Sequence, residues 1–558
     1  MPHTDVLPAL KNTSPWYQRL SSKAYNFVRY SRPWSYVVAA QLKIPFQLIK
    51  WLLPMNDVQI APGKHPIFGY VLDKLTDEAK EKGIARKDLY FPNLRFLKGP
   101  RIFSLIVAYD DKYFKKMTDV NARAAFNLPT LLTQGPELIS RIEHDRLLKP
   151  VIRERLSTNH DRLWLVAKQH CANLAKIWHA EHSVPENITQ LTFEMLAHFV
   201  YNVDTLPNDF AKNLDAFEAQ WQNFDQFSPV KFFPIMDKFI QTSKELVLAH
   251  AASKEDPNLP QNERDLIGDM KQYHQQHSHF TAPDNVAALI SIAGNLPRSI
   301  IAMVYYILTN PEFVTIINAE KPIMIAKFRQ HLAQILQEKP TDLEALLKLS
   351  DSALIDKKGG DFLVFLYKES DVFRGMFNET LRVYWTAPVL PRVNTNLFFN
   401  KIGSWGHDMD LGNGHYLPPR SVGFWPKQRK MNDTDVYENP EQFNPFRDIY
   451  KKENKEQGKI QSFGHPGSMR RCPAQKLSEH MFLATLWQLT ENWQFEMTAE
   501  HKTLATNLPS IRDTHHLDLL GVNTRIKAKL QPKTPKEQES ETKIELPFSH
   551  PRKSLTFY

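Results

Sequence analysis

The strongest constraint in the chain is a single cysteine that lies between a turn-rich loop and a helical pattern. Cys472 is one of two cysteines among 558 residues. The preceding residues 462–471 are rich in turn formers and end in two arginines, and helical periodicity runs from Pro473 to Leu489. Cations and a helix N-terminus both favour a thiolate over a thiol. The pattern therefore predicts an ionised sulfur, which serves as a nucleophile, a redox sensor or an axial haem ligand. Cys171, inside a helical run, is the candidate for an inert core thiol.

Three further motifs precede this loop in order. Glu379 and Arg382 form a Glu-x-x-Arg pattern in an apolar stretch, a Pro-to-Arg segment ends at Arg392, and residues 440–447 read Pro-Glu-Gln-Phe-Asn-Pro-Phe-Arg. Residues three apart share a helix face, so Glu379 and Arg382 are expected to pair. Arg447 is expected to join them in a charge-assisted network. The apolar neighbours predict that this network is buried, and an exposed ion pair of little energetic value is the alternative.

This ordered set resembles the cytochrome P-450 family. The resemblance covers residues 56–530 and implies one large haem domain, mainly α-helical with a minor sheet. It implies haem b (iron protoporphyrin IX) as the cofactor, with Cys472 as the axial ligand of its iron. It places Phe463 and Arg470 in the haem-binding loop and makes Arg146 and Arg392 candidate partners of the haem propionates. The loop is two residues longer than is usual in the family between its aromatic residue and its cysteine.

The helix expected over Asp284–Asn310 corresponds to the oxygen-handling helix of that family, and it departs from the family pattern. Leu296 and Pro297 stand where monooxygenases carry the acid and the alcohol that relay protons. Asn295 with Pro297 partly resembles the prostacyclin synthase and sterol hydroxylase subgroups, and Arg298 partly resembles the arginine of fatty-acid peroxygenases. A proline inside a helix removes a hydrogen bond and kinks the helix. Asn295, Pro297 and Arg298 are therefore the candidate catalytic residues, and a plain helix break is the alternative.

The resemblance implies a haem-thiolate oxidoreductase. The default expectation is a monooxygenase that acts on a hydrophobic, lipid-like substrate with electrons from a separate reductase. The candidate docking face for that partner is a basic set of residues, with a simple solvated loop as the alternative; the set is Lys451, Lys452, Lys455 and Lys459, with Arg471 and Lys476. A reductase-free lipid hydroperoxide isomerase, dehydratase or peroxygenase is the second expectation. A non-catalytic haem- or lipid-binding protein is the third.

The ends of the chain have a different composition. Residues 1–55 carry seven Lys or Arg against one Asp, mixed with aromatic residues, within a chain of net charge +9. This composition suits a membrane surface better than nucleic acid. The most apolar part, Trp34–Leu53, is interrupted by polar residues and predicts a helix in the interface rather than a span, or a helix packed on its own domain. Residues 531–558 are expected to form a flexible tail. Two cysteines allow no disulfide framework, which favours a cytosol-facing, non-secreted protein with peripheral membrane contact.

Overall fold

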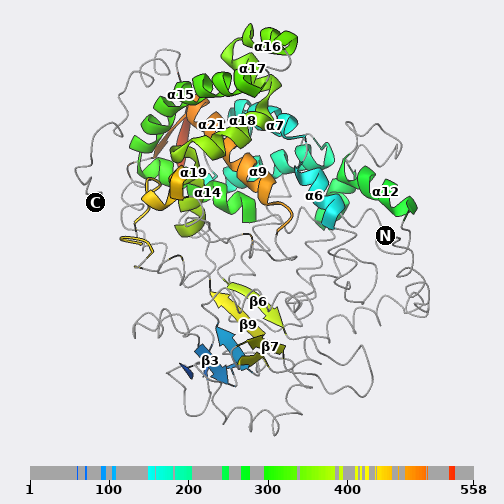
Figure 1. The fold of residues 1–558 in the computed structure, drawn as a ribbon, viewed down its shortest axis with the longest axis vertical. Coiled ribbons are helices and arrows are strands. Elements are labelled where there is room, and N and C mark those ends of the chain that lie inside the picture. The colour runs from blue at the N-terminus through cyan, green and yellow to red at the C-terminus, as the bar shows by residue number, and fades with distance from the viewer. Residues whose placement is uncertain are drawn as a thin grey trace.

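Helices make up most of the part of the chain that can be described. The computed structural model describes most of residues 149–206, 295–335, 340–383, 431–454 and 472–499, the segments 242–249, 265–276 and 527–533, residue 463, and nine short strands between residues 59 and 426. Those nine strands are described by their backbone alone. In Figure 1 the helices gather in the upper part of the view and these strands in the lower part.

The helical part contains twelve labelled α-helices, a further helical segment at residues 242–249 and two short 3-10 helices. The α-helices are α6 (Lys149–Ser157), α7 (His160–Ala172), α8 (Leu174–Ile177), α9 (Val184–Tyr201), α12 (Leu266–Gln276), α14 (Asn295–Thr309), α15 (Glu312–Ile335), α16 (Pro340–Leu347), α17 (Asp351–Lys357), α18 (Gly359–Glu369), α19 (Asp371–Val383) and α21 (Gln475–Asn492). The 3-10 helices are η11 (Asp448–Tyr450) and η12 (Lys452–Asn454).

The strands form one five-stranded sheet and three two-stranded sheets. The larger sheet has the order β1 (Gln59–Ile60), β3 (Leu89–Pro92), β5 (Ser104–Val107), β9 (Val422–Pro426) and β6 (Val389–Val393). The pairs β3–β5 and β9–β6 are antiparallel, whereas β1–β3 and β5–β9 are parallel. The small sheets pair β2 (Tyr70–Val71) with β4 (Leu94–Arg95), β7 (Met409–Gly412) with β8 (His415–Leu417), and β10 (Trp493–Met497) with β11 (Ala528–Pro532).

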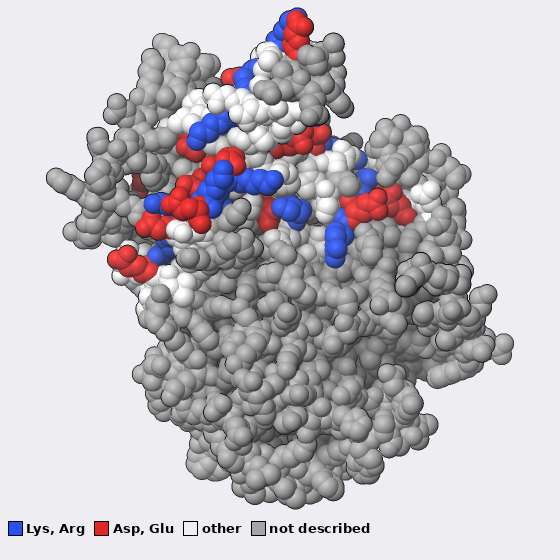
Figure 2. Space-filling model, in the orientation of Figure 1, with Lys and Arg blue, Asp and Glu red and all other residues white. Residues whose placement is uncertain are grey.

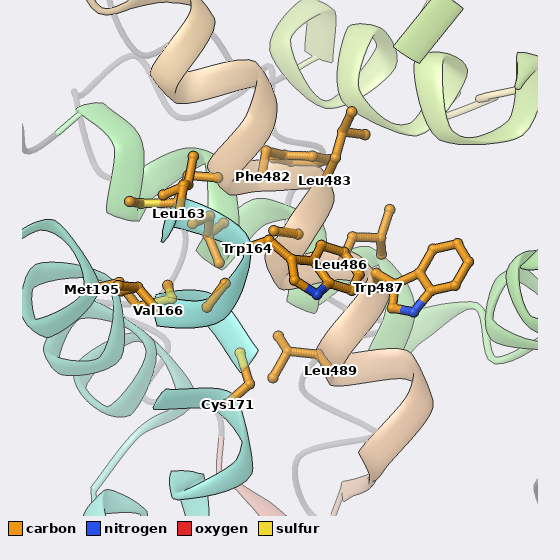
Figure 3. Close-up of a cluster of buried hydrophobic side chains, with 14 of the residues drawn as sticks. Leu163, Trp164, Val166, Cys171, Met195, Phe482, Leu483, Leu486, Trp487 and Leu489 are labelled. Atoms are coloured by element: carbon orange, nitrogen blue, oxygen red, sulfur yellow. The ribbon is translucent and has the colours of Figure 1, made fainter. Parts of the chain in front are cut away.

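The centre of the helical part is α21. Leu477 and all residues from Glu479 to Thr490 are buried, so the helix is covered on all sides, as is typical of a helix inside a core. Its closest packing partner is α7, and α18 and α14 also lie against it. Figure 3 shows part of this core; its labelled side chains are Leu163, Trp164, Val166 and Cys171 from α7, Met195 from α9, and Phe482, Leu483, Leu486, Trp487 and Leu489 from α21.

Two histidines meet inside this interface. The Nδ1 atoms of His160 and His480 are in contact, and both rings are buried. His160 Nε2 lies 3.1 Å from the carbonyl oxygen of Leu156, so that nitrogen carries the proton and donates. His160 Nδ1 is then the acceptor, and His480 Nδ1 is the donor. His480 Nε2 is left as a buried lone pair without a hydrogen-bond partner among the described residues. Burial lowers the pKa of both rings, and it lowers that of His480 to about 2, with His160 and Lys476 adding to the shift.

This architecture confirms the expectation of a mainly helical fold with a minor sheet. The helical pattern after Cys472 is α21, and the described part of the helix expected over residues 284–310 is α14. Residues 1–55 and 534–558 lie outside the described residues, whereas β11 continues to Pro532. No single helix in the described part is long and apolar enough to span a membrane. Among the described helices, one bent pair, α14 with α15, is long and apolar enough when the two are taken together, and it bends by 106°.

Candidate functional site

Glu379 is the centre of a buried ion-pair network on α19. Its Oε1 accepts hydrogen bonds from Arg382 Nη2 at 2.7 Å, the Asn444 backbone N–H at 2.8 Å and Arg447 Nε at 3.2 Å. Its Oε2 accepts from Arg382 Nε at 2.7 Å and the Tyr450 hydroxyl at 2.6 Å. The side chains of Glu379 and Arg382 have no exposed surface. A buried carboxylate needs this many donors, because the loss of hydration must be offset by hydrogen bonds to its oxygens.

Arg382 uses its remaining donors on the segment that follows the sheet. Nη1 donates to the carbonyl oxygens of Met431 and Pro440, both at 2.8 Å, and Nη2 donates to that of Gln442 at 3.1 Å. Burial by itself would lower the pKa of Arg382, but the hydrogen bonds and negative charge of Glu379 hold it above its ordinary value. The guanidinium therefore stays charged and organises a chain segment some fifty residues downstream.

Arg447 fixes the same segment from its other end. Its guanidinium donates to the carbonyl oxygens of Glu438, of Asn439 at 3.0 Å and of Gln442 at 2.7 Å. Asn439 has a φ of 43°, a left-handed backbone that asparagine tolerates better than most residues. Backbone carbonyl oxygens between residues 438 and 442 thus accept hydrogen bonds from two buried arginines, Arg382 and Arg447. We call residues 438–450 the meander segment.

The meander segment also joins α19 to α14. Gly375 on α19 lies against the carbonyl oxygen of Pro445, and a Cβ at this glycine would come within 1.8 Å of that oxygen. The Phe443 ring stacks on Tyr306 of α14, with ring centroids 3.6 Å apart and planes inclined by 13°. At position 375 only glycine, which has no side chain, lets α19 and the meander segment approach each other so closely. The segment that holds the ion-pair network is therefore packed against the helix that carries Pro297.

Cys472 lies three residues before α21, at the end of the predicted loop. Its thiol is exposed, and its backbone N–H donates to the carbonyl oxygen of Phe463 at 2.8 Å. Phe463 is half-buried and stacks on Phe377 of α19, with centroids 6.4 Å apart and planes inclined by 11°. Cys171 is different, because it lies wholly inside the core and burial raises its pKa. Neither cysteine forms a disulfide.

The Cys472 sulfur fits a haem whose iron takes one ligand from the protein. An exposed cysteine before a helix N-terminus can offer a thiolate, which is one of the axial ligands that haem iron takes. The described residues contain no group of three or more His, Cys, Asp or Glu side chains that could hold a metal ion by itself. A thiolate-ligated haem supplies O–O bond cleavage. Cys472 would hold the iron of such a haem, and Phe463, stacked on Phe377, would fix the position of the Cys472 backbone.

Of the other predicted site residues, some are described by the structure and some lie outside the described residues. Asn295 is the first described residue of α14, although its side chain lies outside the description; Pro297 is buried and Arg298 is half-buried on the same helix. Arg392 lies on β6, with its backbone paired to Gly423 of β9. Arg146 and Arg470 lie outside the described residues.

Two members of the Glu379 network were not expected from the motifs. They are the Tyr450 hydroxyl and the Asn444 backbone N–H. Tyr450 is wholly buried, and burial, followed by the Glu379 charge, raises its pKa well above the ordinary value. The hydroxyl therefore keeps its proton and donates it to Glu379. The sequence offered one hint of this role, which is that Tyr450 is an aromatic residue next to a run of lysines.

No protein-family model matches the chain, and no curated protein matches it. Solved structures do match. The cytochrome P450DA heme domain is 14% identical, with a TM-score of 0.52, and the match covers 86% of this chain and 98% of that one. A cytochrome P450 named CYP102L1 is 13% identical, with a TM-score of 0.54, and the match covers 85% of this chain and 99% of that one. At these identities the likeness is one of fold. The chain therefore has the fold of a cytochrome P450 haem domain.

Proposed function

We propose that the protein is a haem-thiolate oxidoreductase in which Cys472 ligates the iron of haem b. The observation that carries this proposal is the placement of Cys472, an exposed thiol before α21 whose backbone is tied through Phe463 to α19. The buried Glu379 network on α19 supports it, because the network fixes the position of the helix on which Phe463 stacks. Arg470 is proposed to lie beside the haem, and Arg146 and Arg392 are proposed to bind its propionates.

The leading reaction is monooxygenation of a hydrophobic, lipid-like substrate with electrons from a separate reductase. The resemblance of Asn295, Pro297 and Arg298 to subgroups that act on prostanoids, sterols and fatty acids supports the lipid class. Lys451 and Lys452, with Lys476, are the described lysines of the proposed docking face. They pair with Asp448 at 3.0 Å, Glu369 at 2.5 Å and Glu479 at 2.9 Å. Blue and red side chains are correspondingly intermixed on the described face in Figure 2.

One observation favours the reductase-free alternative. Leu296 and Pro297 are both buried on α14, and neither carries a group that transfers a proton. An enzyme that starts from a lipid hydroperoxide needs no proton relay to dioxygen and no electron donor. In that reaction Asn295 or Arg298 would position the peroxide or the carboxylate of the substrate. The intermixed charges of the described docking face are compatible with an enzyme that has no redox partner.

The cofactor part of the proposal is tested with the two cysteines as a matched pair. Purified, haem-loaded protein is reduced and exposed to carbon monoxide, and the absorption of the carbonyl complex is recorded. The parent and Cys171→Ala are expected to give a thiolate-type spectrum, whereas Cys472→Ala is expected to lose it. A thiolate-type spectrum in Cys472→Ala would overturn the assignment.

The reaction class is tested by incubating the parent protein with a fatty-acid hydroperoxide, without NADPH or reductase. Conversion that depends on Cys472 indicates a hydroperoxide isomerase, dehydratase or peroxygenase. Oxidation that appears only after a reductase and NADPH are added indicates a monooxygenase. Substrate-induced spectral shifts without turnover in either assay indicate the third alternative, a non-catalytic haem- or lipid-binding protein.

Peripheral membrane contact on the cytosolic side is proposed for residues 1–55, which lie outside the described part of the chain. Their basic and aromatic composition supports binding to anionic lipids. Sedimentation with vesicles that contain anionic lipid tests the idea. We expect binding that weakens as salt increases and that is lost when residues 1–55 are removed.

A further inference from the structure

Tyr450 holds the Glu379 network together at a point that the motifs do not mark. Glu379 Oε2 receives only two of the five hydrogen bonds to the carboxylate, from Arg382 and from Tyr450. The Tyr450 contact is the shortest of the five at 2.6 Å. A hydrogen bond to a buried charged group is worth more than one between neutral groups, because the charge has no water to replace the lost donor.

The main chain of Tyr450 is fixed as firmly as its hydroxyl. Its N–H donates to the carbonyl oxygen of Arg447 at 2.9 Å, and its own carbonyl oxygen accepts from Arg374 Nε at 2.7 Å. Arg374 is buried on α19 and also donates to the carbonyl oxygens of Tyr367 and Lys368 at the end of α18. Tyr450 is therefore attached to α19 at two points, one through Glu379 and one through Arg374.

A third attachment to α19 lies next to the cysteine. Phe463, whose carbonyl oxygen accepts the Cys472 N–H, stacks on Phe377, two residues before Glu379. Tyr450 and Phe463 are thus both held against the same helix. A change at Tyr450 can therefore reach Cys472 through α19 and Phe463.

We propose that Tyr450 is a positioning residue for the Cys472 thiolate, acting through Glu379, α19 and Phe463. This inference rests on the proposed haem-thiolate function. Without the hydroxyl, Glu379 Oε2 keeps one donor, and the carboxylate rotates toward its remaining partners. The α19 helix is then fixed less firmly to the meander segment, and through Phe463 the Cys472 thiolate would be held less firmly at the iron of a bound haem.

The test compares Tyr450→Phe with Tyr437→Phe. Tyr437 is also buried and lies near the same arginine, with the Arg382 guanidinium 5.0 Å from its ring centre. Its hydroxyl, however, lies 3.9 Å from Met431 Sδ rather than on Glu379. Phenylalanine keeps the ring in both variants. The matched pair therefore separates the loss of a buried hydroxyl from the loss of the Glu379 contact.

The measured quantity is the rate of conversion, which is the rate at which the carbonyl complex loses its thiolate-type spectrum, at a temperature where circular dichroism shows each variant to be folded. We expect a rate about tenfold higher in Tyr450→Phe, since the lost bond is to a charged group. We expect Tyr437→Phe to stay within about twofold of the parent. A lower melting temperature with an unchanged rate would mean a merely structural role and overturn the inference.

Two further outcomes are distinguishable. A parent protein that binds haem without a thiolate-type spectrum overturns the proposed function itself, before any variant is compared. If Tyr450→Phe does not fold, 3-fluorotyrosine at position 450 replaces it, because fluorine makes the hydroxyl a stronger donor and keeps the ring shape. We then expect a slower conversion than in the parent, and an equal or faster conversion overturns the inference.

Discussion

The buried histidine pair predicts that the fold loses stability in mild acid. His480 has a pKa of about 2 in the folded protein against an ordinary value of 6.5, and burial is the main cause. Because the folded-state pKa is lowered, the unfolded chain binds a proton that the folded chain does not. The stabilisation is complete above pH 6.5 and is lost as pH falls from 6.5 toward 2. Because of His480 alone, the free energy of unfolding therefore decreases by about 2 kcal/mol when the pH is lowered from 7 to 5.

The surroundings of the pair support this direction. Lys476 lowers the pKa of both rings, whereas Asp161 and Glu479 raise that of His160 without reversing the effect of its burial. His160 therefore contributes a dependence of the same sign. Protonation of His480 would also place a positive charge on the Nε2 atom that has no acceptor among the described residues.

The substitution His480→Asn isolates the contribution of His480. The asparagine amide can still donate to His160 Nδ1, but it does not titrate. Unfolding free energies of the full chain are measured by urea denaturation at pH 7, 6 and 5. We expect the loss between pH 7 and pH 5 to shrink by about 2 kcal/mol in His480→Asn and to stay unchanged in His182→Asn, where the histidine is exposed. An equal pH dependence in the parent and in His480→Asn would refute the reasoning.

Two other substitutions test the meander segment and its network. Glu379→Gln leaves two buried guanidinium groups without their carboxylate and is expected to cost about 3–5 kcal/mol in urea denaturation. The control Glu344→Gln removes an exposed pair with Lys348 and is expected to cost less than about 1 kcal/mol, so similar losses would contradict the assigned burial. Gly375→Ala places a methyl group on the Pro445 carbonyl and is expected to lower stability by about 3 kcal/mol or more. A melting temperature equal to that of the parent would show that the meander segment does not cross α19 so closely.

Short-range patterns in the sequence predicted part of this structure well. Three-residue spacing and apolar neighbours are enough to pair Glu379 with Arg382 on one helix face, and the structure has that pair. Apolar periodicity after Cys472 likewise predicts a helix, and the structure has α21 there. In these cases the responsible contacts lie within one or two helical turns, so the local sequence carries the information.

Long-range contacts were beyond the reach of such patterns. Tyr450 and Glu379 are separated by 71 residues, and His160 and His480 by 320. Neither histidine has a distinctive neighbour in the sequence, and their pairing follows only from the packing of α7 on α21. The ion pairs of the lysines on the predicted docking face could not be predicted from local sequence either, because one partner, Glu369, lies 83 residues before Lys452.

The packing of α21 against α7 has a consequence for the synthesis of the protein. The apolar face of α7 leaves the ribosome long before the helix that covers it, since the two contacting histidines are 320 residues apart. At bacterial and eukaryotic elongation rates this delay is roughly 16–64 s. During that time Leu163 and Trp164, which are buried in the finished protein, lack the partner that covers them. Nascent chains of this protein should therefore depend on chaperones until α21 has emerged.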